Sequence, residues 1–223
     1  MLAFAANSLL CRMALQRTGI DPASFTAVRL VAGATVLALL VGSRKRAPER
    51  AGSWVSALAL FVYAAAFSFA YASLPAGTGA LLLFGAVQVT MIGRGLWRGD
   101  RLGPRQQLGL LVALAGLVVL VWPGLAAPPL GGALLMIGAG IAWGVYSLRG
   151  AGSADPLRAT ASNFLRAVPM SLALSGLMIR RATPDAVGLA CAVASGALAS
   201  GLVMPFGTRC CASFARPARP RCN

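Results

Sequence analysis

The stretch that decides the fold class is DPASFTAVRLVAGATVLALL, residues 21–40. After Asp21 it contains a single charged side chain, Arg29. An α-helix rises 1.5 Å per residue, so about 20 such residues cross the roughly 30 Å hydrocarbon core of a bilayer. The stretch therefore predicts a transmembrane helix.

The rest of the chain has the same character. Of its 223 residues, 58% are hydrophobic and only 11% are charged, whereas a soluble domain carries about 25% charged residues. Because so few charges cannot cover a water-facing surface, we expect the solvent of this chain to be lipid. We predict an all-α, polytopic membrane protein of about eight transmembrane helices. Their approximate spans are 1–16, 24–43, 54–74, 77–96, 107–124, 130–149, 162–179 and 186–203.

The chain is strongly basic, with a formal net charge of +15. On a soluble face this charge would indicate nucleic-acid binding. Here most basic residues lie between apolar runs, as Arg44, Lys45, Arg46 and Arg50 do. That placement indicates a topology signal and contact with lipid headgroups. We therefore expect the lipid bilayer as a partner and no nucleic acid.

The same residues predict the orientation of the helices. The connection 44–53 carries four basic residues and the connection 97–106 carries three, whereas 74–77 and 124–130 carry none. Since cytoplasmic connections are enriched in Lys and Arg, the first pair is predicted to be cytoplasmic. The expected location is the bacterial inner membrane, with the N-terminus inside the cell. Arg180 and Arg181 disagree with this topology, because they fall in a connection predicted to be outside.

The usual parts of a catalytic site are missing from the sequence. It has no histidine and no HExxH or CxxC motif, and its acidic residues fall between the apolar runs. Metal-assisted hydrolysis and histidine acid–base chemistry depend on such groups. We therefore predict a protein that is not an enzyme and has no catalytic residues, metal or cofactor. The five acidic residues are Asp21, Glu49, Asp100, Asp155 and Asp185.

A faint internal repeat relates the two halves of the chain. Asp21-Pro22 precedes a span with Arg29, and Asp155-Pro156 precedes a span with Arg166. Five segments separate the two copies, and a unit with an odd number of spans enters the membrane in the opposite orientation. Inverted repeats of this kind occur in secondary transporters, with the substrate site between the copies near the midplane. Chance similarity between two apolar stretches is the alternative.

Several stretches together resemble the EamA family of the drug/metabolite transporter superfamily, over residues 1 to about 203. In the first half they are FAANSLLCRMAL, DPASFTAVRLVAGATVLALL, AFSFAYASLPAGTGALLLFGAVQVTM and LGLLVALAGLVVLVWPG, and LLMIGAGIAWGVYSLRG begins the second half. The resemblance implies ten helices in two inverted five-helix repeats. It also implies a secondary transporter that exports or imports a small-molecule metabolite by alternating access.

The end of the chain departs from the family pattern. We expect a first repeat at 1–125, three helices of a second repeat at 126–203, and a basic tail at 204–223 unrelated to the family. With one guanine restored near Leu202, permitted codons encode GLGYAVWYALL and then RVFRAPGAAALQ. That text is similar to FAYASLPAGTGALLLFGAVQ of the first repeat. The hypothesis is a frameshift; the alternative is a disordered basic tail.

Polar groups within the spans are the first candidates for substrate binding, because they are costly in lipid. The amides of Asn7 and Gln88 would bind substrate or, as the more common role, bridge helices. Arg29 would pair with an anionic substrate, or would reach the interface or a loop carbonyl. Tyr71 and Trp143 would line a cavity, or pack in the core.

Two alternatives to a transporter stay open at this point. The chain would be a non-transporting membrane fragment if the second repeat is too short to complete the midplane cavity. It would be a membrane-embedded interaction subunit if a stoichiometric partner copurifies with it. Association into a homodimer is a further hypothesis.

Overall fold

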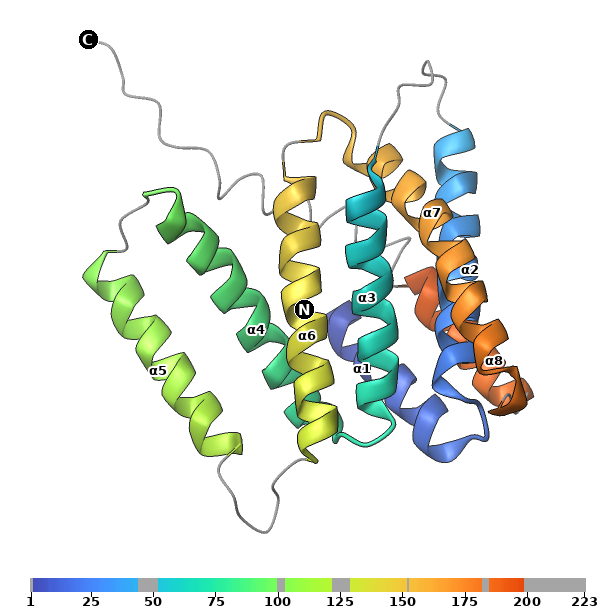
Figure 1. Cartoon of the computed structure of the whole chain (residues 1–223), viewed down its shortest axis with the longest axis horizontal. Coiled ribbons are helices and arrows are strands. Elements are labelled where there is room, and N and C mark those ends of the chain that lie inside the picture. The colour runs from blue at the N-terminus through green and yellow to red at the C-terminus, as the bar shows by residue number, and fades with distance from the viewer. Residues whose placement is uncertain are drawn as a thin grey trace.

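The computed structural model describes residues 2–43, 52–99, 103–121, 129–151, 153–181 and 185–198. These residues form eight α-helices and one short 3-10 turn, Ile179–Arg181 (Figure 1). The helices are α1 (Leu2–Arg17), α2 (Pro22–Gly42), α3 (Trp54–Tyr71), α4 (Ala76–Trp97), α5 (Pro104–Val121), α6 (Leu130–Gly150), α7 (Pro156–Leu177) and α8 (Ala186–Leu198).

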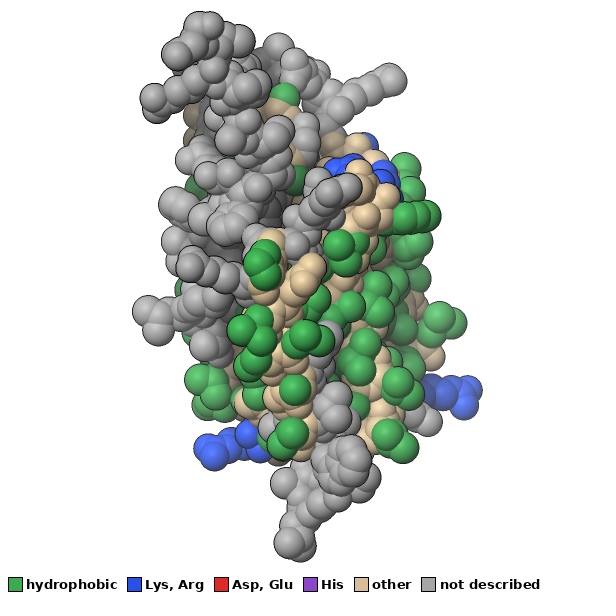
Figure 2. All heavy atoms as spheres, turned by 90° about the vertical axis from the view of Figure 1, so that its left-hand side faces the viewer, with side chains coloured by type: hydrophobic (Ala, Val, Ile, Leu, Met, Phe, Trp, Pro, Cys, Tyr) green, Lys and Arg blue, Asp and Glu red, His purple; other side chains and the backbone are tan. Residues whose placement is uncertain are grey.

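The predicted all-α membrane fold is confirmed, with one helix at each predicted span. Within the described residues, α2, α3, α4 and α6 are long and apolar enough to cross a bilayer. Figure 2 shows hydrophobic side chains over the middle height of the α4–α5 side and basic side chains toward both ends. This distribution fits a bundle whose sides face lipid and whose ends face the headgroups.

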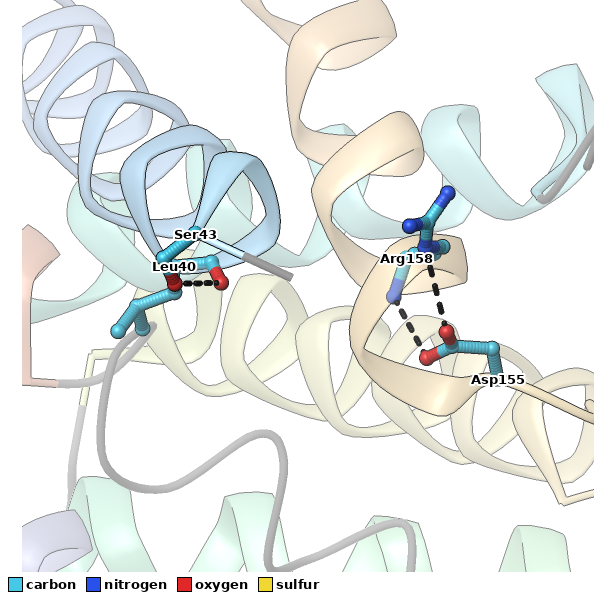
Figure 3. A network of polar contacts seen from close by, with 4 residues as sticks. All are labelled: Leu40, Ser43, Asp155 and Arg158. Carbon is cyan, nitrogen blue, oxygen red and sulfur yellow. Dashed lines mark hydrogen bonds and ion pairs between the residues drawn. The ribbon is translucent and has the colours of Figure 1, made fainter. Parts of the chain in front are cut away.

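The predicted starts of α2 and α7 were wrong by two and six residues, at 24 and 162 instead of Pro22 and Pro156. The reason is N-capping. The Asp21 carboxylate accepts a hydrogen bond from Ser24 N at 2.9 Å, and that of Asp155 accepts one from Arg158 N at 3.2 Å (Figure 3). A capping aspartate followed by proline starts a helix whether or not the first turn is apolar.

Helices α2 and α7 pack against each other and run in opposite directions (Figure 1). Ser24 in the first turn of α2 lies 3.5 Å, Oγ to Oγ, from Ser175 near the end of α7. The neighbouring helices pack in a way that corresponds between the two repeats. Helix α3 packs on α6 and α7, whereas α8 packs on α1 and α2. This arrangement agrees with the inverted repeat that the sequence predicts.

Helix α4 packs along α6 through glycine. A Cβ atom on Gly140 would lie 2.6 Å from both the Leu83 carbonyl oxygen and the Ala86 side chain, so only glycine permits this approach. Small residues at such contacts let helices pack closely where lipid supplies no hydrophobic drive. Helix α4 packs on α6 and on α5, and α4 and α5 lie on one side of the bundle, on the left in Figure 1.

Candidate functional site

A column of aromatic rings follows one face of α3 and continues onto α6. Tyr63, Phe67 and Tyr71 are four residues apart, which places them on one helix face, and consecutive ring centroids are 5.5 and 4.7 Å apart. Trp143 of α6 lies 4.8 Å from Tyr63, and Tyr146 lies 5.5 Å from Trp143. We call these five residues the aromatic ladder. It joins α3 to α6 through the bundle core.

Arg29 of α2 is buried against this ladder, with 5% of its surface exposed. Its guanidinium carbon lies 5.1 Å from the Phe67 ring centroid and about 6 Å from that of Tyr63, within cation–π range. Nη2 donates a hydrogen bond to the Ala64 carbonyl at 2.9 Å. Arg29 therefore neither reaches the interface nor binds a loop carbonyl; it binds a carbonyl of α3.

No carboxylate among the described residues balances this charge. The ion pair that the described residues form joins Arg158 to Asp155, at 3.4 Å, at the start of α7 and away from Arg29. Aromatic faces and one carbonyl thus stabilise a cation inside an apolar bundle. Such a group is costly in lipid and marks a position of interest for function.

Asn7 of α1 bridges two helices. Its Oδ1 accepts a hydrogen bond from Ser195 Oγ of α8 at 2.6 Å, and both side chains are buried. Ser195 is the tenth residue of α8, as Tyr63 is the tenth residue of α3. Ser195 and Tyr63 therefore hold the same position in their helices, and each of them contacts the first helix of a half: Asn7 of α1 and Trp143 of α6.

Tyr71 is fully buried and lies where α3 turns into α4. Its hydroxyl donates to the Ala76 carbonyl at 3.4 Å, and Ser8, the neighbour of Asn7, lies beside that hydroxyl. The Tyr71 carbonyl accepts from Gln16 Nε2 at 3.4 Å. Tyr71 thus connects the aromatic ladder to α1.

The structure brings four of the five predicted site residues into one connected region. Arg29, Tyr71 and Trp143 meet at the ladder, where Trp143 is partly buried, and Asn7 precedes Ser8, which lies beside Tyr71. Gln88 is different, because its side chain is exposed on α4. A sequence argument fixes the depth of Gln88 in the span but not the face on which it lies.

Asn163 is a polar residue that the sequence analysis missed. It is the eighth residue of α7, as Arg29 is of α2, whereas Arg166 is the eleventh. Its Oδ1 accepts a hydrogen bond from Ser53 N at 3.0 Å, and a Cβ on Gly52 would clash with it. Counting residues from Asp155 would have identified Asn163 as the counterpart of Arg29.

An open groove of about 420 Å³ lies apart from this region, among α2, α7 and α8. Its walls are almost wholly aliphatic. The described residues contain no cluster of three or more His, Cys, Asp or Glu that could hold a metal ion. The lining residues are Ala27, Val28, Val31, Ala32, Thr35, Val36, Leu172, Val193 and Ala197.

Comparison with known proteins agrees with this architecture. An uncharacterized protein of Pseudomonas aeruginosa is 59% identical over 203 residues, which cover 91% of this chain and 71% of that protein. A solved crystal structure with 21% identity is similar in fold, with a TM-score of 0.53 over 98% of this chain and 91% of its own. The family model of the EamA-like transporters matches residues 1–122. The chain belongs to the EamA-like transporter family.

Proposed function

We propose that the chain moves a small metabolite across the bacterial inner membrane by alternating access, with its N-terminus in the cytoplasm. The observation that carries this proposal is the antiparallel pair α2 and α7, each capped by an Asp-Pro sequence. Two inverted halves have equivalent inward-facing and outward-facing arrangements, so rocking one against the other alternates the access to a site between them.

The proposed substrate region is the aromatic ladder, which includes Tyr71 and Trp143, together with Arg29 and Asn7. Rings offer apolar surface, and Arg29 offers a positive charge that no carboxylate of the described residues neutralises. Gln88 is proposed as a further contact, because its amide is a polar group exposed within an apolar span, which is costly in lipid. A small molecule with a negatively charged group would complement this set.

The experiment is solute release from proteoliposomes loaded with a small-molecule extract of bacterial cytosol. Mass spectrometry identifies the solutes that leave. The Ser24→Cys/Ser175→Cys variant, built on the 3.5 Å Oγ–Oγ distance, fixes α2 to α7 when oxidised. We expect release by the reduced variant and retention after oxidation, with oxidised wild-type protein as the control. Retention of every solute by reduced protein would favour the non-transporting fragment instead.

We also propose a division of the chain into a first repeat at 1–125, a partial second repeat at 126–203 and a tail at 204–223. In this proposal the tail is produced by a frameshift. The tail lies outside the described residues. Resequencing the DNA that encodes residues 195–223 tests this point. One additional base near Leu202 would establish the frameshift. A confirmed reading frame would reject it and make loss of transport the expectation.

A further inference from the structure

Two arginine–tryptophan pairs lie at one end of the bundle. The guanidinium carbon of Arg94 lies 5.6 Å from the Trp97 ring centroid, at the end of α4. That of Arg166 lies 5.8 Å from the Trp54 ring centroid, at the start of α3. The two indoles are 84% and 61% exposed. Exposed indoles in a membrane protein favour the headgroup level of the bilayer.

Both pairs lie at the same end although they come from different helices. Helix α4 ends at the same end of the bundle at which α3 begins, the upper end in Figure 1. Helix α7 starts beyond this level, because Asn163 in its third turn is bonded to Ser53. Arg166, three residues later, therefore reaches Trp54 instead of water above the bundle.

Each of the two guanidinium groups lies over an indole ring within cation–π range and makes no hydrogen bond or ion pair to another described residue. A guanidinium has five N–H donors in its plane. Since no described residue accepts from these donors, they suit bidentate binding of a phosphate. The nearest abundant phosphates at this level belong to phospholipids.

Charge favours an anionic headgroup over a zwitterionic one. Asp155, the acidic residue described at this end, already pairs with Arg158, so no other acidic residue of the described part of the chain balances the remaining arginines there. Basic residues near an anionic leaflet contribute about 1 kcal/mol each to membrane attraction. The arginines described at this end are Arg94, Arg98, Arg149, Arg158 and Arg166.

We infer that this end of the bundle binds anionic phospholipid headgroups through the Arg94–Trp97 and Arg166–Trp54 pairs. Each indole anchors at the headgroup level, and the guanidinium paired with it holds the lipid phosphate. The interaction is independent of transport, because neither arginine belongs to the proposed substrate region.

Native mass spectrometry of the purified full chain tests this inference. Phosphatidylglycerol and phosphatidylcholine are titrated separately, and the dissociation constant of the first bound lipid is measured. Wild-type protein should prefer phosphatidylglycerol. The Arg94→Gln/Arg166→Gln variant should weaken that preference about 25-fold, or fivefold for each arginine. The Arg94→Lys/Arg166→Lys variant keeps the charge but loses the bidentate fork, and should lie between the two.

Arg17→Gln/Arg180→Gln is the matched control, because it removes two exposed arginines from the other end of the bundle. It should keep the wild-type preference. An equal loss in this control would mean that net charge alone attracts the lipid, and would overturn the inference. No preference of wild-type protein for phosphatidylglycerol would overturn it as well, without reliance on any variant.

Discussion

Helices α2 and α7 begin with the same hydrogen bonds but carry different side chains at the eighth position. In each, an aspartate caps the third residue and the next residue is proline. In each, the fifth residue is threonine, and its hydroxyl donates to that proline's carbonyl at 2.7 Å: Thr26 in α2 and Thr160 in α7. The eighth residue is Arg29 in one copy and Asn163 in the other.

This difference follows from what each position faces. The bonds that start a helix are local and do not depend on its direction in the membrane, so both copies use the same residues. The eighth residue instead meets a part of the chain that is distant in sequence. Arg29 meets aromatic rings of α3, and Asn163 meets the backbone of residues 52–53. The first copy thus buries a charge, and the second copy tethers a loop.

The largest expected effect separates these two roles. Arg29→Ala removes a charged hydrogen bond and the cation–π contacts, and should lower the free energy of unfolding by about 3 kcal/mol. Asn163→Ala leaves Ser53 N without its acceptor and should cost about 1 kcal/mol. Reversible unfolding in mixed detergent micelles measures both. Equal losses would mean that the buried charge gives Arg29 no special role in stability.

The two capping aspartates sharpen the comparison, since they should behave alike. Asp21→Ala and Asp155→Ala each remove an N-cap, and each should cost about 1 kcal/mol of unfolding free energy. Asp155 also pairs with Arg158, so its loss should be slightly larger. The same unfolding assay applies. If one substitution were neutral, the two copies would not share this start.

A double-mutant cycle between Asn7 and Ser195 tests whether the amide bridges helices. The 2.6 Å hydrogen bond between their side chains should give a coupling energy of about 0.6 kcal/mol, as is usual for bonds between membrane helices. The four unfolding free energies of the cycle provide the measurement. Zero coupling, with loss of solute release in Asn7→Ala, would assign Asn7 to substrate binding alone.

Gln88 should have the smallest effect on stability. It is exposed on α4, so Gln88→Ala should change the unfolding free energy by less than about 0.5 kcal/mol. We predict that the variant nevertheless lowers solute release at equal abundance in the membrane. Release equal to that of the wild type would remove Gln88 from the proposed site.

The candidate site shows where sequence reasoning succeeds and where it stops. Asn7 and Arg29 were recognised because polar groups within apolar spans are rare, and both are buried at helix contacts. Gln88 satisfies the same criterion but lies on an exposed face. The sequence predicts Arg166 as the counterpart of Arg29 because both are arginines, and so misses Asn163. Composition thus reveals depth in the membrane, but not the neighbour that a side chain meets.

The sequence by itself determined the helical membrane class, the positions of eight helices and the relation between the Asp-Pro starts. These features depend on local hydropathy and local capping, which neighbouring residues specify. Only the tertiary structure decided which helix faces touch, where the charge of Arg29 is stabilised and which residue is its counterpart. In lipid, the outer face of a helix is as apolar as its packed face, so no hydrophobic periodicity marks the inside.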